Sequence, residues 1–484
     1  MELSNLITMI ISIITFGNIL LAAVVVFFER RAIGSTWAWL MIIYFVPLLG
    51  FVAYIFLGRQ LKKKNFYKLS SEESAYLQSV VDKQLEELKD NKLSDHELIN
   101  KYSDLIQLNL SSSNSLVSMD NDIVIFNDGH DKFNSLFDDI SQAKKEINIQ
   151  YYIIKRDSLG KKLRDAIVKK AKEGVKVRIL YDGFGSRTIS RSFFKELRAH
   201  DGEVGVFFPS FLKLVNFRIN NRNHRKLCII DGKIAYIGGF NVGDEYLGLK
   251  RKFGYWRDTH FKIMGGAVNE IQGRFILDWN QATKQQKVNI KQFSFQSEKS
   301  KGMSPVQIVA SGPHSETEHL KNMYIKLILS AKKSVYIQTP YFIPDSSFMD
   351  ACKIALLSGV DVHIMIPNKP DHPFVYWATW AYAGELLSYG AKILLYEKGF
   401  LHAKTIVVDQ EVASVGTTNI DTRSFKLNFE VNATVYDQKV ATQLYELFEK
   451  DRQVCSKLTI ERYRKRSYLI KFKEAISRLL SPIL

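Results

Sequence analysis

Cysteine is scarce in this chain. Three occur among 484 residues, Cys228, Cys352 and Cys455, and they lie far apart in the sequence. This spacing fits neither a disulfide framework nor a zinc site. It argues against a small secreted protein held together by disulfides and against a zinc-binding fold. The three thiols are expected to be reduced and mostly buried, which places the bulk of the chain in a reducing compartment.

Acidic residues are in deficit. The chain has 50 Asp and Glu against 67 Lys and Arg, a formal net charge of +17. Such an excess suits a polyanion, which can be nucleic acid or an anionic membrane surface. No recognisable nucleic-acid-binding module is present, so anionic membrane lipids are the expected partner and nucleic acid is not. At 484 residues the chain is long enough for two sizeable cores.

Long apolar runs are confined to the N-terminal region. Residues 6–28 and 37–57 are both of spanning length, with one proline, Pro47, in the second. The first run lacks a basic segment before it and an obvious cleavage site, which argues against a signal peptide. Aromatic residues at both ends of the second run, such as Trp37 and Tyr54, suit a membrane interface. The two runs therefore predict a transmembrane hairpin.

Basic residues after the second run predict the orientation of this hairpin. The residues concerned are Arg59, Lys62, Lys63, Lys64 and Lys68. An excess of Lys and Arg marks the cytoplasmic side, so we expect a multi-pass protein of the cell membrane with its main body in the cytoplasm. Arg30 and Arg31, between the two runs, argue mildly the other way.

One stretch of the chain occurs twice with the same spacing. In both copies a His is followed by a Lys two residues later, an Asp seven later, a Gly fourteen later and an Asn seventeen later. The first copy consists of His224, Lys226, Asp231, Gly238 and Asn241, and the second of His402, Lys404, Asp409, Gly416 and Asn419. His-x-Lys alone is a weak signal, because it also occurs at His130, His260 and His319 without the following Asp.

Each copy predicts a β-hairpin that gathers its polar side chains. Residues 227–230 and 405–408 are short apolar runs rich in β-branched residues, as in buried strands. Residues two apart on a strand point to the same face, so the His and the Lys project together. Asp231-Gly232 is a turn signal, and a return strand brings the Asn back beside the His. Two such hairpins facing each other would surround a phosphate.

The rest of the body is an internal duplication. Residues 143–150 return as 331–338, and residues 174–180 return as 359–365. Strands that alternate with helices predict an α/β fold with a mixed, largely parallel sheet flanked by helices. Two such halves predict pseudo-two-fold symmetry with one active site at the join.

The motif pattern resembles that of the phospholipase D superfamily, and the chain as a whole resembles a bacterial cardiolipin synthase. Two stretches outside the motifs carry the second resemblance, Ser-Thr-Trp-Ala-Trp at 35–39 and Thr-Pro-Tyr-Phe-Ile-Pro-Asp at 339–345. The resemblance covers nearly all of the chain and implies the same two-half architecture. We expect a membrane hairpin at 1–65, a polar spacer at 66–118, phospholipase D-like halves at 119–297 and 298–455, and a basic amphipathic tail at 456–484.

The resemblance implies a phosphatidyl transfer that converts two phosphatidylglycerol molecules into cardiolipin and glycerol, with no metal or organic cofactor. Such chemistry needs a nucleophile, a proton donor and positive charge around the non-bridging oxygens. The family assigns the nucleophile to the first-half histidine, here His224, which would form a phosphohistidine. His402 is then the acid and base. The groups expected around the phosphate are Lys226, Lys404, Asn241 and Asn419.

Four carboxylates complete the candidate site. Glu430 stands where the family has a histidine-orienting carboxylate for the second half, and Asp258 is the candidate for the first half, with a surface salt bridge as its alternative. Asp231 and Asp409 belong to the catalytic motif. Because they lie at the predicted hairpin turns, we expect structural roles for them more than contact with substrate.

Two other activities remain open at this point. One is a membrane-anchored phosphodiesterase of the phospholipase D type that hydrolyses phospholipid or nucleic acid. The other is a membrane scaffold that keeps the fold without catalysis, against which two complete motifs argue. Product analysis separates the first from a transferase, and substitution of His224 tests the second.

Three apolar segments can each be interpreted in two ways. Residues 207–223 mix apolar and basic side chains just before His224, as a lipid-gripping loop would, but ordinary core packing explains them equally well. The aromatic residues at 374–380 suit core packing better than lipid contact. The tail from residue 462 predicts an amphipathic helix with Leu469, Phe472, Ile476, Leu479 and Leu480 on one face. It would lie on an anionic membrane or dock on the body.

Overall fold

The computed structural model describes residues 2–28, 33–54, 66–67, 70–90, 93, 96–209, 220–283, 287–288 and 302–481. It divides into two compact units, an N-terminal unit of Met1–Lys62 with Pro209–Asn221 and a body of Lys63–Phe208 with Arg222–Leu484. The basic residues that predict membrane orientation, and most of the segment 207–223, lie outside the described residues.

The first apolar run forms a helix of spanning length in the N-terminal unit. Helix α1 (Glu2–Ala23) continues as one π-helical turn, η1 (Val24–Phe28). Its 24 residues Ser4–Phe27 are long and apolar enough to cross a membrane, and most of their side chains are exposed. An exposed apolar helix of this length has lipid as its natural surroundings. This helix therefore has the length and the composition of the first predicted span.

The second apolar run forms two shorter helices, so the predicted hairpin of two spans is shown only in part. Helix α2 (Ile33–Phe45) has 13 residues, or about 20 Å at about 1.5 Å per residue, too short for a hydrocarbon core of about 30 Å. The chain turns back before α3 (Pro47–Ala53), so that the rings of Trp39 and Tyr54 lie 5.2 Å apart. Pro47 causes the break, because it cannot continue a helix but readily begins one.

The body contains one 16-stranded sheet in which the two halves repeat the same strand order. The first half consists of β1 (Val117–Phe126), β2 (Glu146–Tyr151), β3 (Lys176–Asp182), β4 (Glu203–Phe207), β6 (Leu227–Ile230), β7 (Ile234–Gly238) and β9 (His260–Met264). The second half consists of β10 (Ser304–Ser311), β11 (Ser334–Gln338), β13 (Asp361–Pro367), β14 (Lys392–Tyr396), β16 (Thr405–Val408), β17 (Val412–Gly416) and β19 (Asn428–Val435).

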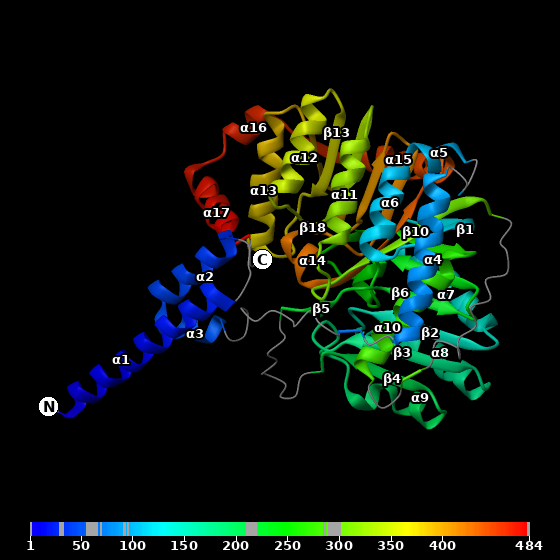
Figure 1. Cartoon of the computed structure of the whole chain (residues 1–484), viewed down its shortest axis with the longest axis horizontal. Coiled ribbons are helices and arrows are strands. Elements are labelled where there is room, and N and C mark those ends of the chain that lie inside the picture. The colour runs from blue at the N-terminus through cyan, green and yellow to red at the C-terminus, as the bar shows by residue number, and fades with distance from the viewer. Residues whose placement is uncertain are drawn as a thin grey trace. The chain divides into compact units, whose positions relative to one another are not determined.

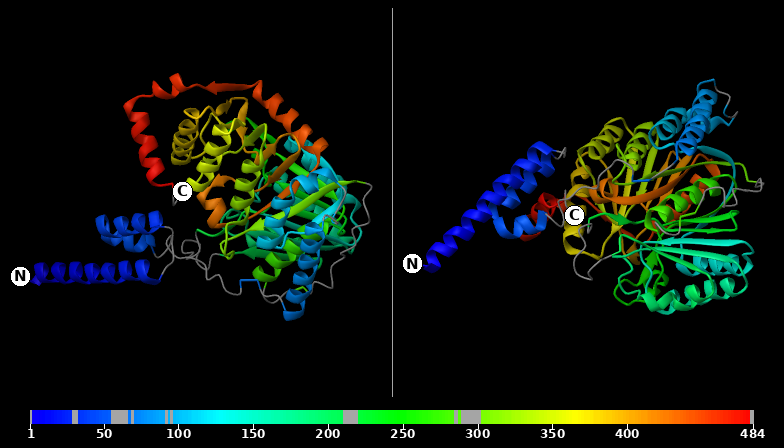
Figure 2. Two further views of the ribbon diagram at one scale, coloured as in Figure 1. Left: turned by 45° about the horizontal axis from the view of Figure 1, so that its top comes forward. Right: turned by 60° about the horizontal axis from the view of Figure 1, so that its bottom comes forward.

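The strand order shows the predicted pseudo-two-fold symmetry directly. From one edge the first half runs β4-β3-β2-β6-β7-β9-β1, and from the other edge the second runs β14-β13-β11-β16-β17-β19-β10. The two halves join where β1 pairs with β10 in antiparallel fashion, and β20 (Cys455–Leu458) extends the far edge beside β14. Figures 1 and 2 show the body with its two halves continuing into one another. The predicted two-half α/β fold is confirmed.

Helices cover both faces of this sheet. In the first half they are α7 (Gly129–Gln142), α8 (Ser158–Lys172), η3 (Arg191–Phe194), α9 (Lys195–Ala199), η4 (Asp244–Leu247) and α10 (Ala267–Ala282). On β2, Ile147 and Ile149 pack in the apolar cluster with α7 and α8, whereas Gln150 donates to Asp278 of α10. Because alternate strand residues point to opposite faces, α10 covers the face opposite α7 and α8.

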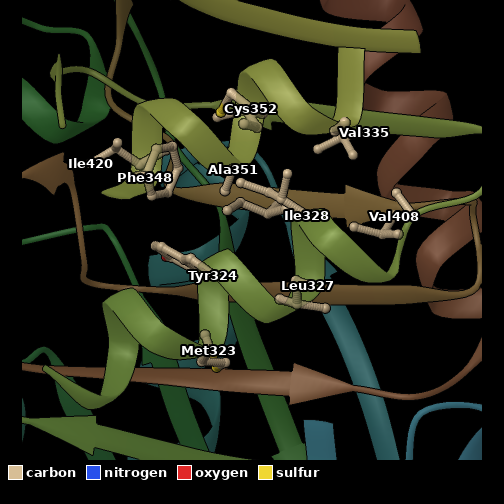
Figure 3. Close-up of a cluster of buried hydrophobic side chains, with 14 of the residues drawn as sticks. Met323, Tyr324, Leu327, Ile328, Val335, Phe348, Ala351, Cys352, Val408 and Ile420 are labelled. Atoms are coloured by element: carbon tan, nitrogen blue, oxygen red, sulfur yellow. The ribbon is translucent and has the colours of Figure 1, made fainter. Parts of the chain in front are cut away.

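The second half is built in the same way. Its helices are α11 (His319–Ser330), α12 (Ser346–Leu357), α13 (Pro373–Leu387), α14 (Thr422–Lys426) and α15 (Gln438–Arg452). Figure 3 shows α11 and α12 burying one face against β11 and β16, with Tyr324, Ile328 and Phe348 among the labelled side chains. Each fully buried side chain of this size contributes about 1.5–3 kcal/mol to stability.

Residues 66–118, predicted to be a polar spacer, contribute to the core of the second half. Helix α4 (Ser71–Lys89) is mostly exposed, whereas α5 (Glu97–Lys101) and α6 (Ser103–Ser113) each bury apolar side chains. Leu105, Ile106 and Leu110 are fully buried in the cluster that includes α11. These apolar residues recur at helical spacing, which explains why the segment packs on the body and does not merely connect it to the anchor.

The C-terminal tail forms α16 (Ile460–Arg464) and α17 (Tyr468–Leu479). Helix α17 packs against α13 through its polar side, on which Glu474 and Ser477 are buried. Its apolar face is left open, with Leu469 62%, Phe472 63% and Leu479 72% exposed. The tail is therefore docked on the body and still presents the predicted apolar face outward. On α13 itself, Trp380 is buried and Phe374 is exposed.

Candidate active site

Both motif copies form the predicted hairpins. Strands β6 and β7 pair in one half, and β16 and β17 pair in the other. The turns begin at Asp231 and Asp409, where φ is +54° and +52°, and the next residue also has a positive φ. Two successive positive φ values characterise the type I′ turn that matches the twist of a hairpin. Gly232 suits this conformation, whereas Gln410 adopts it in the second copy at some steric cost.

The two halves exchange backbone contacts immediately before each motif histidine. Short strand β5 (Arg222–Asn223) pairs with β19 of the second half, and β15 (Gly399–Leu401) pairs with β8 (Tyr255–Arg257) of the first. His224 N then donates to Phe429 O at 2.9 Å, and His402 N donates to Arg257 O at 2.7 Å. Each motif histidine is thereby held against the other half.

This exchange determines which carboxylate orients which histidine. His224 Nδ1 lies 3.0 Å from Glu430 Oε2, and His402 Nδ1 lies 2.6 Å from Asp258 Oδ2. The assignment of Glu430 to the second half and of Asp258 to the first is therefore reversed in the structure. The physical reason is that each carboxylate directly follows the backbone carbonyl that accepts from the opposite histidine. Both carboxylates are fully buried, which excludes a surface salt bridge for Asp258.

The residue that lies beside each carboxylate differs between the two halves. Gly239, on the loop after β7, leaves room for Asp258, because a Cβ there would lie 1.9 Å from Asp258 Oδ1. At the equivalent position of the second half, Thr417 Oγ1 donates to Glu430 Oε2 at 2.5 Å. Asn428 Nδ2 donates to Glu430 Oε1 at 3.2 Å. These contacts fix both carboxylates in place before substrate arrives.

Electrostatics favour neutral histidines in this site. Burial lowers the pKa of His224, and the Lys226 charge adds to that shift while Glu430 opposes it. Burial, aided by Lys404 and opposed by Asp258, lowers the pKa of His402 to about 3. An ionised carboxylate can only accept, so Nδ1 of each neutral ring carries the hydrogen. Nε2 of each ring is then left with its lone pair, as a nucleophile or base requires.

The two carboxylates remain ionised although they are buried. Burial alone would raise the pKa of Glu430, but its electrostatic interaction and hydrogen bond with His224 and the charge of Lys226 together lower it. For Asp258 burial is likewise outweighed by Lys404 and His402.

The motif lysines lie within electrostatic range of both halves. Burial lowers the pKa of Lys226 to about 7 and that of Lys404 to about 8, and the charge of Lys404 adds to the shift of Lys226. Lys226 Nζ donates to His224 O at 2.5 Å, while Lys404 Nζ donates to His402 O and lies 3.0 Å from His402 Nδ1. A bound anion would favour the charged form of both lysines.

The motif asparagines occupy different surroundings. Asn241 Oδ1 accepts from Ile153 N at 3.1 Å, so this side chain is held within the first half. Asn419 Oδ1 is buried and accepts no hydrogen bond from the described residues, and Asn419 lines a cavity of about 200 Å³. His224 lines the same cavity, so this cavity joins the first motif to the second.

The motif aspartates bind backbone and do not line this cavity. Asp231 accepts from the amides of Lys144, Lys145 and Glu146 at 2.7–2.9 Å. Asp409 accepts at 2.8 Å from the amides of Lys332, Lys333 and Ser334. Each carboxylate thus ties its hairpin turn to the start of the neighbouring strand.

Asp409→Asn is expected to lower stability while leaving most of the catalysis intact. One amide oxygen cannot replace a carboxylate that accepts three backbone hydrogen bonds, and the loss is about 1–3 kcal/mol. Thermal unfolding should show a lower Tm, and turnover of the folded enzyme should remain within about tenfold of wild type. Loss of turnover with an unchanged Tm would contradict the structural role.

Several residues of the site carry no recognisable sequence signal. Arg225, between the motif His and Lys, is fully buried, and its NH1 donates to both carboxylate oxygens of Asp278 at 2.6 Å. Arg257, the residue before Asp258, forms an ion pair with Asp451, with 2.8 Å between Nε and Oδ2. The lining of the cavity comes from both halves and consists of Tyr152, Arg222, His224, Tyr341, Ile343, Val375, Asn419, Asp421, Arg423, Ser424 and Asn428.

Within the described part of the chain, no group of three His, Cys, Asp or Glu side chains is placed to hold a metal ion.

Two repeated halves that each contribute one His-Lys-Asp motif define a phospholipase D-like protein. Comparison with known families agrees, because the family model described as "Cardiolipin synthase, PLD-like domain" matches residues 136–255 and 324–452. A second model, described as "Phospholipase D-nuclease N-terminal", matches residues 18–59 in the apolar region.

Relatives that match the whole chain identify the family more closely than the fold does. The chain is 52% identical to "Major cardiolipin synthase ClsA" of Bacillus subtilis over 478 residues, which cover 99% of each chain. It is 50% identical to "Cardiolipin synthase 2" of Staphylococcus epidermidis and 51% identical to "Cardiolipin synthase" of Listeria welshimeri, again over 99% of this chain. The chain belongs to the cardiolipin synthase family and is an enzyme of the phosphatidyltransferase class.

A solved structure shares the fold at much lower identity. Phosphatidylserine synthase of Haemophilus influenzae is 17% identical, with a TM-score of 0.59 over 80% of this chain and 100% of that one. The likeness supports the two-half architecture.

Proposed function

We propose that this enzyme transfers a phosphatidyl group from one phosphatidylglycerol to another, giving cardiolipin and glycerol through a phosphohistidine intermediate. The observation that carries the proposal is the pair of histidine–carboxylate contacts, each made between the two halves, in one site. The names of relatives about 50% identical over nearly the whole chain support the same product.

The first half-reaction uses His224 as nucleophile. With Nδ1–H held by Glu430, Nε2 attacks phosphorus of the donor lipid and forms a P–N bond. The P–O bond to glycerol breaks, and the leaving oxygen takes a proton from His402. Lys226 and Lys404 stabilise the charge on the non-bridging oxygens, where buried cations act most strongly.

The second half-reaction reverses the roles of the histidines. His402 accepts the proton from a hydroxyl of the second phosphatidylglycerol, whose oxygen forms a new bond to phosphorus. The P–N bond to His224 breaks, which releases cardiolipin and restores the enzyme. Water in place of the lipid alcohol would give phosphatidic acid by the same steps.

Substrate binding prepares His402 for its role as an acid. Its pKa of about 3 reflects burial and the neighbouring Lys404 charge in the absence of an anion. A phosphodiester beside the ring adds negative charge and raises that pKa. The proton donor is therefore present chiefly when substrate is bound.

Lipid products test this proposal most simply. Purified enzyme would be incubated in detergent with labelled phosphatidylglycerol and a chelator, beside a preparation without substrate. Cardiolipin and glycerol in equal amounts are expected. Phosphatidic acid as the sole lipid product would instead establish a hydrolase, and no turnover of this lipid would reject the substrate.

The enzyme is further proposed to be held in the cell membrane by α1, with the body on the cytoplasmic side. The exposed apolar surface of α1 and the three free cysteines support this arrangement. Helices α2 and α3 pack against α1, so the second apolar run would complete the anchor beside it without a second continuous span.

Helix α17 is proposed to rest on the anionic membrane surface. Replacing Phe472 and Leu479 together by Ser removes two exposed apolar side chains, so activity on phosphatidylglycerol vesicles should fall about tenfold. In detergent micelles it should change less than twofold, because α17 docks through its opposite side. The matched control is Leu357→Ser, an exposed leucine of α12. An equal loss in vesicles and micelles would contradict membrane contact by α17.

A further inference from the structure

Two arginines outside both motifs line the cavity that reaches His224. Arg222 lies on β5, two residues before His224, and Arg423 lies on α14, four residues after Asn419. They come from different halves of the body. The cavity therefore contains two guanidinium groups in addition to the histidine and carboxamide of the motifs.

Arg222 is almost fully buried beside the cavity. It is only 2% exposed, and its guanidinium lies 4.7 Å from the ring centre of Phe184. Its NH1 lies 3.8 Å from Asp182 Oδ1, and that carboxylate also accepts from the amides of Phe184, Gly185 and Asn223. The guanidinium is thus fixed from one side while its other side borders the cavity.

The two guanidinium groups are close enough to repel each other. The pKa of Arg222 is lowered first by burial and further by the charge of Arg423, while Asp182 and Tyr152 oppose the shift. Two like charges beside one cavity are stabilised when an anion binds between them. A phosphate suits this arrangement, because guanidinium groups bind its oxygens in a planar, bidentate manner.

Asp421 lines the same cavity and is sensitive to an anion bound there. Burial raises the pKa of Asp421 to about 6, although hydrogen bonds from Ser424 and the charge of Arg423 oppose the shift. Its Oδ1 already accepts from Ser424 N at 2.5 Å. A phosphate near Arg423 would raise this pKa further and favour the uncharged acid.

Asn428 supplies an unpaired acceptor on the same wall. It is the register partner of Arg222 across the β5–β19 pairing and is 6% exposed. Its Nδ2 donates to Glu430, but its Oδ1 accepts no hydrogen bond from the described residues. A buried acceptor that lines a cavity is stabilised by a ligand that donates, such as a hydroxyl.

The proposed reaction requires a second anion site of this kind. Cardiolipin carries two phosphates joined by a single glycerol, so the acceptor lipid brings its own phosphate close to the one on His224. We infer that Arg222 and Arg423 bind the phosphate of the acceptor phosphatidylglycerol, and that Asn428 accepts from the glycerol hydroxyl of that lipid that does not attack phosphorus. This inference rests on the proposed function and specifies how that function selects a lipid alcohol over water.

The inference is tested by measuring initial rates with two different acceptors. One assay measures cardiolipin formed from phosphatidylglycerol, and the other measures labelled glycerol exchanged into phosphatidylglycerol before cardiolipin accumulates. Both assays use the same donor lipid, but free glycerol has no phosphate. Arg423→Gln should lower the ratio of cardiolipin synthesis to glycerol exchange by about 10–100-fold, the effect of removing a charged hydrogen bond. Arg423→Lys should restore part of the ratio, and Arg251→Gln, at an exposed arginine outside the cavity, serves as control.

Each outcome has a distinct meaning. A fall of synthesis and exchange by the same factor, or no fall in either, would overturn the inference. A ratio that falls for Arg423→Gln and recovers in part with Lys supports an acceptor phosphate site. A wild type that catalyses neither reaction would reject the proposed function itself, independently of the arginines.

Discussion

His224→Ala is expected to reduce cardiolipin formation by about 10⁵–10⁶-fold, the loss seen when a covalent nucleophile is removed. Without Nε2 of His224 no phosphatidyl group can be held between the two half-reactions. The variant should remain folded, because Glu430 keeps its contacts with Thr417 and Asn428. Product formation and thermal unfolding would be measured together.

A matched control and a second variant sharpen this prediction. His130 belongs to an incomplete His-x-Lys sequence and is exposed, so His130→Ala should retain wild-type turnover. His402→Ala removes the proton donor, and a donor lipid with an acidic leaving group should bypass that need in the first half-reaction. If the activated lipid is cleaved by the His224 variant but not by the His402 variant, the roles of the two histidines are reversed.

Glu430→Gln is expected to lower turnover by about 10³–10⁴-fold, the scale set by removing the carboxylate behind a catalytic histidine. The substitution keeps the size of the side chain but loses the charge that holds Nδ1–H of His224. Asp258→Asn should act similarly on His402. Glu446→Gln, at an exposed glutamate of α15, is the control and should not affect turnover.

The pH profile distinguishes this orienting role from a merely structural one. The nucleophile must be neutral, so activity falls as pH drops through the pKa of His224. Burial lowers that pKa, and the Glu430 charge partly opposes the shift. Removing the charge therefore lowers the pKa further and moves the acidic limb of the profile to lower pH. An acidic limb that stays in place or moves to higher pH would contradict the proposed contact.

The fold and the motif residues could be predicted because both rest on local patterns that occur twice. Short apolar runs followed by Asp fix the hairpins, and the duplicated helix–strand segments fix the common strand order. The partners of the histidines could not be assigned in the same way. Glu430 reaches His224 only because β5 pairs with β19 of the other half, a contact between segments separated by about two hundred residues.

Other features depend on tertiary context that composition does not reveal. The sequence places Pro47 in the second apolar run, but its consequence, the return of α3 onto α2, depends on packing between Trp39 and Tyr54. The segment predicted to be a spacer is polar on average, yet α6 buries its few apolar residues against the body. Arg222 and Arg423 belong to no motif and meet only at the cavity between the halves.

The covalent intermediate is the most direct test of this account. Enzyme mixed briefly with phosphatidylglycerol labelled at phosphorus would be denatured, digested and mapped by mass spectrometry. A phosphatidyl adduct on the peptide that carries His224, labile in acid and absent from His224→Ala, is the expected result. Cardiolipin formation without any labelled histidine peptide would contradict the two-step transfer, and an adduct on His402 would contradict the assigned nucleophile.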